Sequence, residues 1–195
     1  MGDMSGDLDL LVRWQGGDRS AANVLVHRYS PPLEALFRYK TNEQDFEDLK
    51  QQVWLELTKS RPTEFHSGFR AYLFGIARYV LIRYCEQKQR VPAWDPLTTS
   101  LVEIDLSLSQ KVAKALGARD LRSTLQRLPL DVQVLLESRY MLDMSTLELA
   151  AMYGVPPGTV RSRLHHARKQ LAAEIRGAGW CALGDSRKQF EDLRA

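Results

Sequence analysis

The sequence predicts an all-α protein made of two small helical domains joined by a linker. Apolar residues recur at intervals of three and four along most of the 195-residue chain, and no alternating run of β-branched residues competes with this period. A stretch rich in proline, threonine and serine separates the two periodic halves. We therefore expect a first domain over residues 1–90, a linker over 91–118, a second domain over 119–175 and a C-terminal tail over 176–195.

Composition and charge narrow the class of protein. The hydrophobic share of 44% supports a folded core, and the basic residues cluster although the net charge is only +3. The N-terminus is polar, with Asp3 where a signal peptide would carry positive charge, and no run approaches the roughly 18 apolar residues of a membrane helix. We expect a cytoplasmic protein without membrane insertion. Cys85 and Cys181 lack CxxC spacing, so both are expected to be thiols.

The first two helices of the N-terminal half carry clear boundary signals. Leu8, Leu11 and Val12 mark the apolar side of a short helix that should stop at the following glycine pair. Asp18 is a suitable N-cap for the next helix. Because proline lacks an amide donor, Pro31–Pro32 is expected to interrupt that helix and begin another.

Two longer amphipathic helices should follow, over residues 44–59 and from about residue 69 to 87, separated by a break at residues 60–63. Phe69, Leu73 and Ile76 share one face of the second of these helices. Phe69 is therefore interpreted as a structural residue, whereas Tyr72 and Tyr79 should lie at the border of the buried face.

A helix-turn-helix is predicted between residues 145 and 171. Ser145 and Glu148 have the spacing of a capping box, and Gly154 is a suitable left-handed C-terminal stop. The first helix should present a small apolar face made of Leu147, Ala150 and Ala151. Pro156–Pro157 then opens the second helix, whose inward residues should be Val160, Leu164 and Ala167.

The outward faces of the second helix are polar and basic, which fits the major groove of DNA, where arginine can contact guanine edges and other cations hold phosphates. The candidate DNA-binding residues are Thr159, Arg161, Ser162, Arg163, His165, His166, Arg168 and Lys169.

Both halves of the chain resemble the extracytoplasmic-function (ECF, group 4) subfamily of the sigma-70 family of bacterial RNA polymerase sigma factors. Residues 120–175, with the Leu128–Pro129 pair and the GTVRSRL run at 158–164, are similar to region 4 of these proteins. Residues 7–90, with RYSPPLEALFRYK, DFEDLKQQVWLEL and FRAYLFGIARYVL, are similar to region 2. A response regulator would need an α/β receiver domain, and the helical pattern offers none.

The resemblance implies an alternative sigma factor that binds core RNA polymerase and directs transcription from promoters through their −10 and −35 elements. It implies contacts with the β′ clamp and the β flap of the polymerase, and a possible anti-sigma factor as a further partner. The face that would bind the β′ clamp is polar and mostly acidic: Asp45, Glu47, Asp48, Gln51 and Gln52.

The resemblance also implies that residues 60–68 and the helix after them recognise and melt the −10 element. Melting needs aromatic faces for unpaired bases and cations for phosphates. The candidate residues of this surface are Arg61, Phe65, His66, Arg70, Tyr72, Arg78, Tyr79 and Arg83.

The chain departs from the family pattern at three positions. Tyr72 replaces the usual tryptophan and Tyr79 the usual asparagine, which bears on melting or −10 specificity. Lys50 lies within the acidic stretch, which bears on polymerase affinity.

No catalytic or metal-binding motif is present, so we expect neither an enzyme nor a cofactor or metal. Two other readings of the sequence stay open. A stand-alone helix-turn-helix regulator would not need to bind core polymerase, and an adaptor or anti-sigma-like protein would not bind DNA sequence-specifically.

Overall fold

The computed structural model describes residues 4–60, 68–88 and 123–177, and within these ranges it contains helices and no strand. The first group comprises α1 (Met4–Gln15), α2 (Arg19–Phe37), α3 (Glu43–Lys59) and α4 (Phe69–Gln87). The second comprises α6 (Leu130–Tyr140), α7 (Thr146–Tyr153) and α8 (Pro157–Gly177). The all-α prediction is confirmed. None of the described helices is long and apolar enough to cross a membrane.

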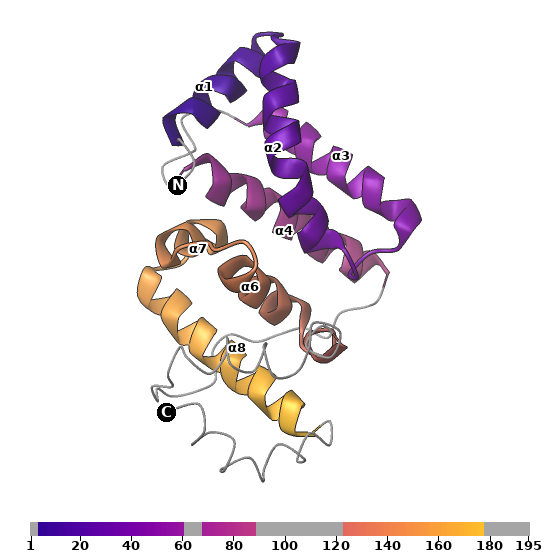
Figure 1. Ribbon diagram of the computed structural model, residues 1–195, viewed down its shortest axis with the longest axis vertical. Coiled ribbons are helices and arrows are strands. Elements are labelled where there is room, and N and C mark those ends of the chain that lie inside the picture. Colours follow the sequence, from indigo (N-terminus) through magenta and orange to yellow (C-terminus); the bar gives the residue numbers. More distant parts are fainter. Residues whose placement is uncertain (1–3, 61–67, 89–122, 178–195) are drawn as a thin grey trace, which may run out of the picture.

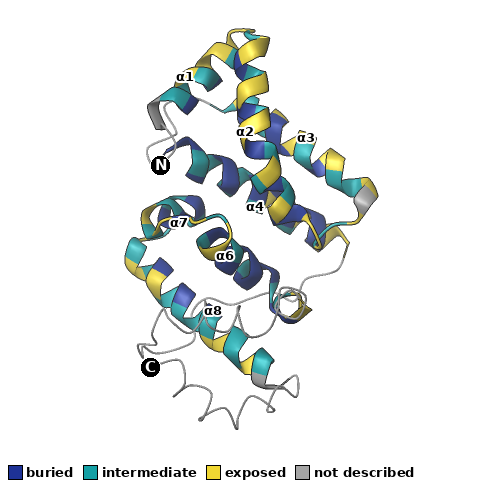
Figure 2. Cartoon of the chain, viewed as in Figure 1, coloured by how far each residue is buried: buried dark blue, intermediate teal, exposed yellow. Residues whose placement is uncertain are grey.

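The two groups lie one above the other, with α4 between them (Figure 1). Helix α4 packs against α1, α2 and α3 on one side and against α6 and α7 on the other, and α8 covers α6 and α7 from outside. Buried residues are therefore found around most of α4, including Phe69, Leu73, Phe74, Ala77 and Leu81 (Figure 2). The predicted bounds of α3 and α4 are confirmed, as is the structural role of Phe69.

The turn between α1 and α2 is held by Asp18, which is the N-cap that the sequence predicts. Its carboxylate accepts hydrogen bonds from the amides of Ser20 and Ala21, at 2.8 and 3.2 Å, and from the guanidinium of Arg13 at 2.7 Å. Hydrogen bonds from the Ser20 hydroxyl and from Arg13 hold the pKa of Asp18 well below its ordinary value. Val12, expected on the buried side of α1, is 49% exposed, so that prediction was wrong.

Helix α2 runs without interruption through Pro31–Pro32, so the predicted break at these prolines was also wrong. Leu25, Tyr29, Leu33 and Leu36 are buried at a regular helical spacing on both sides of the pair. Each proline removes one amide donor. The continuous buried face offsets that loss, because a break would turn Leu33 and Leu36 away from the core.

The helix-turn-helix has the predicted geometry. The Ser145 hydroxyl accepts from the Glu148 amide at 3.1 Å, and the Ser145 amide donates to the Glu148 carboxylate at 2.8 Å. Gly154 ends α7 in the left-handed conformation with φ of 63°, which a side chain would strain. Val160, Leu164 and Ala167 of α8 are buried, as expected.

The inward face of α7 was predicted incorrectly at Leu147. This side chain is 70% exposed, whereas Leu149 is fully buried. Two residues correspond to about 200° around a helix, so only one of the two leucines can face the core. The expected linker (91–118), the tail (176–195) and Cys181 fall largely or wholly outside the described residues, and Cys85 is a buried thiol.

Replacing Ser145 with alanine should remove half of the capping box and lower the free energy of unfolding by about 1 kcal/mol. Urea denaturation followed by circular dichroism measures this loss. Thr146→Ala is the control, because it deletes the neighbouring hydroxyl while leaving both capping-box hydrogen bonds in place. Equal stability of Ser145→Ala and Thr146→Ala would contradict the role of the cap.

Candidate functional site

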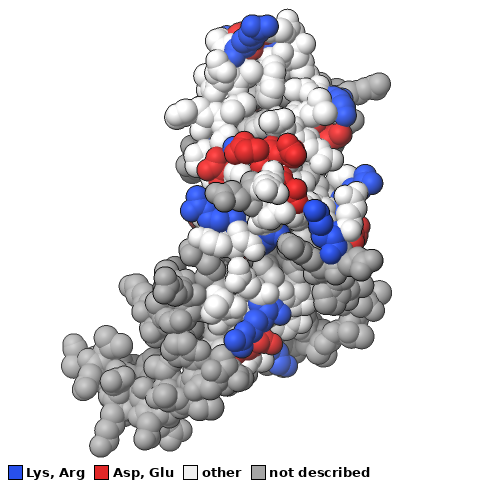
Figure 3. All heavy atoms as spheres, turned by 90° about the vertical axis from the view of Figure 1, so that its right-hand side faces the viewer, with Lys and Arg blue, Asp and Glu red and all other residues white. Residues whose placement is uncertain are grey.

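The outer side of α3 presents the polar surface that the sequence predicts. Glu47, Asp48, Gln51 and Gln52 are exposed, and acidic side chains gather on the side of the molecule where α3 lies (Figure 3). Asp45 is turned toward α4, where its carboxylate lies 3.2 Å from the Lys88 ammonium. The nearby Tyr84 hydroxyl and the Lys88 ammonium lower the pKa of Asp45, although burial opposes the shift.

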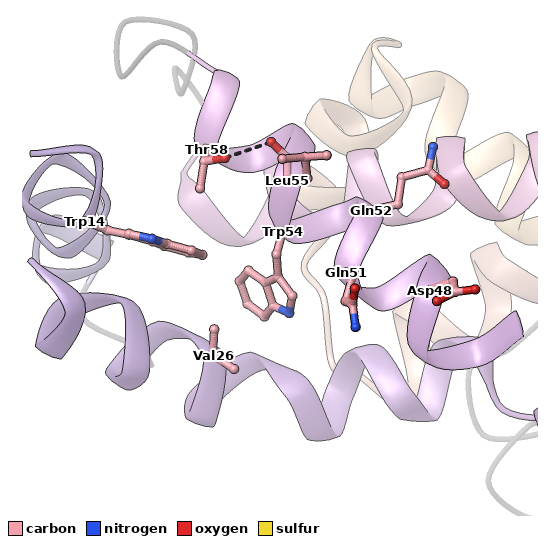
Figure 4. A pocket seen from close by; sticks show the side chains of 8 residues that line it. All are labelled: Trp14, Val26, Asp48, Gln51, Gln52, Trp54, Leu55 and Thr58. Carbon is pink, nitrogen blue, oxygen red and sulfur yellow. Dashed lines mark hydrogen bonds between the residues drawn. The ribbon is translucent and has the colours of Figure 1, made fainter. Parts of the chain in front are cut away.

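A groove of about 570 Å³ lies beside these residues, between α1, α2 and α3. Its lining consists of Trp14, Val26, Asp48, Gln51, Gln52, Trp54, Leu55 and Thr58 (Figure 4). The two indole rings meet at a centroid distance of 5.9 Å, and Leu55 is 56% exposed. The apolar half of this site was not predicted from the sequence. The pattern of α3 alone could not show that Trp14 and Val26, from two other helices, complete it.

The Trp54 side chain leaves one buried polar atom unsatisfied. Its indole Nε1 is buried and has no hydrogen-bond partner among the described residues. A buried donor without an acceptor costs about 1–3 kcal/mol.

Lys50, the basic residue within the acidic stretch, is directed toward α2 and its own helix. Its ammonium lies 3.3 Å from Glu34 and 2.9 Å from Glu47, and 5.2 Å from the centroid of the Phe46 ring. Partial burial opposes its charge, but the hydrogen bonds to Glu47 and Glu34 leave its pKa raised. The acids around it thus neutralise the charge that departs from the family pattern.

Two arginines of α4 that were predicted to bind DNA face the second group of helices. Arg78 makes two hydrogen bonds of 2.9 Å to the carboxylate of Asp131 on α6. Arg70 donates to the carbonyl of Leu142 and lies 3.4 Å from the carboxylate of Glu148.

The other described candidates on α4 are closer to solvent. Tyr79 is 55% exposed, and Arg83 donates to its hydroxyl at 3.2 Å, whereas Tyr72 is half-buried. Three further candidates lie outside the described residues: Arg61, Phe65 and His66.

On α8, Arg161 and Lys169 are exposed, and the remaining candidates are half-buried: Thr159, Ser162, Arg163, His165, His166 and Arg168. Arg163 lies over the ring of Tyr153, with 5.8 Å between its guanidinium carbon and the ring centroid. Desolvation, followed by the neighbouring side chains of His166, Arg168 and Lys169, lowers the pKa of His165. Within the described residues, no group of three metal-binding side chains occurs.

The different settings of Arg161 and Arg163 give different expected effects on stability. Arg163→Ala should lower the free energy of unfolding by about 1 kcal/mol, because it removes a partly desolvated cation–π contact. Arg161→Ala, two residues away on the exposed side of the helix, should change it by less than about 0.5 kcal/mol. Parallel urea denaturation curves measure both values. Equal losses for the two variants would show that Tyr153 does not anchor Arg163.

Both halves of the chain match known protein families. Residues 25–91 match the family model for Sigma-70 region 2, and residues 118–171 match that for Sigma-70 region 4. The region 2 match thus includes α3 and α4, and the region 4 match includes the helix-turn-helix.

Individual relatives match over nearly the whole chain. The ECF RNA polymerase sigma-E factor of Haemophilus influenzae is 27% identical over 186 residues, covering 90% of this chain and 98% of that protein. The sigma-E factor of Escherichia coli K12 is 27% identical over 188 residues, with coverages of 90% and 97%. The structure of CnrH in complex with the cytosolic domain of CnrY shares the fold, with a TM-score of 0.59 and 22% identity over 88% of this chain and 98% of that one. With both sigma regions present in the family's order, the chain belongs to the extracytoplasmic-function subfamily of the sigma-70 family.

Proposed function

We propose that this chain binds core RNA polymerase through the groove beside α3 and directs it to promoters through α4 and α8. The observation that carries the proposal is the presence, in one chain, of a tryptophan-lined groove with Asp48 at its edge and a helix-turn-helix with exposed basic residues. Phosphodiester synthesis is assigned to the polymerase, which in bacteria acts in the cytoplasm. The chain supplies promoter specificity and melting.

The groove suits a helix of the β′ clamp that carries both apolar and basic side chains. Trp14, Trp54 and Leu55 offer an apolar floor, and tryptophans in such pockets often dominate the free energy of binding. Asp48 at the edge would attract basic residues, which speeds encounter and fixes orientation more than it adds affinity.

Reversing the charge at the groove should therefore weaken polymerase binding. Asp48→Arg is expected to raise the Kd for core polymerase at least tenfold, because it sets a cation against the basic partner helix. Fluorescence titration of the labelled chain with core polymerase measures this change. Asp9→Arg, an equal change of charge on the exposed side of α1, is the control and should leave the Kd near that of the wild type. Equal effects of both variants would mean that α3 is not the docking surface.

Recognition of the −10 element is assigned to α4 and to the segment before it. Tyr79 offers an exposed ring on which an unpaired base can stack, and Arg83 beside it offers a cation for a phosphate. Tyr72 is half-buried and would contribute at the edge of the same surface. Arg61, Phe65 and His66 remain candidates by resemblance to the family.

Recognition of the −35 element is assigned to α8, with the β flap as the polymerase contact of this domain. Arg161 is exposed near the start of α8, where the recognition helix of this motif contacts bases. Arg163 is held over Tyr153, so it is better placed to orient the helix than to contact a base. Lys169 is exposed two turns further along and suits a phosphate.

Arg161→Ala should cost roughly 1–3 kcal/mol of binding to a cognate promoter and little on unrelated DNA, if it makes a bidentate contact to a base. Lys169→Ala should weaken binding to all sequences about equally and reduce the salt dependence. Holoenzyme binding to promoter and non-promoter duplexes across a salt series separates the two effects. Equal, sequence-independent losses from both variants would contradict base recognition by Arg161.

An anti-sigma factor is proposed as a further partner, by analogy. CnrH, which shares the fold, was solved with the cytosolic domain of CnrY bound. Copurification of the chain with proteins of its own organism, followed by a competition assay against core polymerase, would test for such a partner.

A further inference from the structure

The side of α4 that faces the second group of helices carries Arg70 and Arg78, two of the basic residues that the sequence predicts to bind DNA. Arg70, Arg78 and, from the turn after α2, Lys40 each pair with an acid of the second group. The acids, in the same order, are Glu148, Asp131 and Glu137. Opposite charges therefore meet at three points along this interface.

Arg78 is the best-held of these basic residues. Its guanidinium makes the two bonds to Asp131 and lies 4.5 Å from the centroid of the Tyr153 ring. The Tyr153 hydroxyl donates to the Asp131 carbonyl at 3.3 Å. Burial raises the pKa of Tyr153, so this residue remains a neutral phenol between Arg78 and Arg163. The cluster Arg78–Asp131–Tyr153, here called the latch, thus joins α4, α6 and α7.

Two further features show that the interface is closely packed. The side chains of Lys40 and Glu137 are only 4% and 13% exposed, so solvent screens this ion pair much less than a surface pair. At Gly75, a Cβ atom would lie 3.5 Å from the Met152 carbonyl oxygen and 3.9 Å from its Cα. The backbones of α4 and α7 therefore approach closely at this glycine, and a large side chain there would force them apart.

We propose that the second domain of this chain and promoter DNA compete for the same side of α4. When the second domain is closed on α4, Arg70 pairs with Glu148 and Arg78 with Asp131. DNA phosphates would have to displace those carboxylates. The chain alone is then self-inhibited for single-stranded DNA, and opening of the latch exposes the binding surface. This inference rests on the proposed role of α4 in binding the −10 strand.

The size of the effect follows from the fraction of open molecules. The apparent Kd equals the intrinsic Kd divided by the competent fraction. If about a tenth of the molecules are open, a fully opened variant binds DNA about tenfold more tightly. Because the proposal assigns Arg70 and Arg78 to DNA, the interface must be opened by changing other residues, Asp131 on α6 or Gly75 on α4.

Two variants open the interface by independent means. Asp131→Arg replaces the attraction to Arg78 with repulsion, and Gly75→Trp wedges α4 from α7. Each has a matched control. Glu174→Arg makes the same change of charge on α8, which lies beyond α6 and α7 from α4 (Figure 1). Gly75→Ala adds a Cβ at ordinary contact distance. Asp131→Asn is a milder variant, for use if Asp131→Arg fails to fold, and should give a smaller change of the same sign.

Small-angle scattering of each variant gives the radius of gyration, and fluorescence anisotropy gives the Kd for a labelled, mixed-sequence single-stranded DNA. Asp131→Arg and Gly75→Trp should have larger radii than the wild type and bind the DNA roughly tenfold more tightly. Gly75→Ala should match the wild type, and Glu174→Arg should show only the effect of added charge. The proposal is overturned if the opened variants bind no more tightly than their controls, or if both folded variants stay as compact as the wild type.

Run-off transcription with core polymerase and genomic promoter fragments separates this proposal from the proposed function. Transcripts that require the wild-type chain support the function, whatever the latch variants do. Transcripts that do not depend on the chain contradict the function, while tighter DNA binding by the opened variants would still support competition for α4.

Discussion

Helix α4 is packed on both sides, and the arrangement of the other helices depends on this double packing. One side supplies core contacts to α1, α2 and α3, and the other holds α6 and α7 through the salt bridge of Arg78 with Asp131. An arginine at such a place must be paired, because a buried cation without a partner costs several kcal/mol. Asp131, in the first turn of α6, supplies the carboxylate, and the Tyr153 ring covers the guanidinium. The position of the second domain follows from this cluster.

Because α4 and its neighbours fill the centre, the surfaces left outward lie at two separate places. The groove is lined by residues of α1, α2 and α3, whereas α8 packs against α6 and α7 and lies beyond them from α4 (Figure 1). A polymerase contact and a DNA contact on opposite parts of the molecule suit a protein that connects the two. The surface assigned to the −10 element differs from these two, since α6 and α7 of the same chain cover part of it. Closure of the second domain on α4 is therefore expected to affect promoter binding and polymerase binding differently.

The sequence predicts the features that depend on local spacing, and fails where distant residues decide. The Asp18 cap, the capping box at Ser145 and the left-handed Gly154 follow from neighbouring residues, and all three are confirmed. The break at Pro31–Pro32 was predicted from proline chemistry alone, but packing on both sides of the pair keeps α2 continuous. The partners of Arg78 could not be predicted, because Asp131 lies 53 residues away and the pattern of α4 does not reveal a second packed side.

The most direct test of this account is the distance between the two groups of helices, measured by pulsed electron resonance between spin labels. Ala35→Cys on α2 and Gln170→Cys on α8 place labels at exposed positions, in a Cys181→Ser background that leaves the buried Cys85 in place. The free chain should give one short distance, and addition of core polymerase with promoter DNA should replace it with a longer one. The same distance in the free chain and in the promoter complex would contradict the claim that α4 holds either its own domain or DNA.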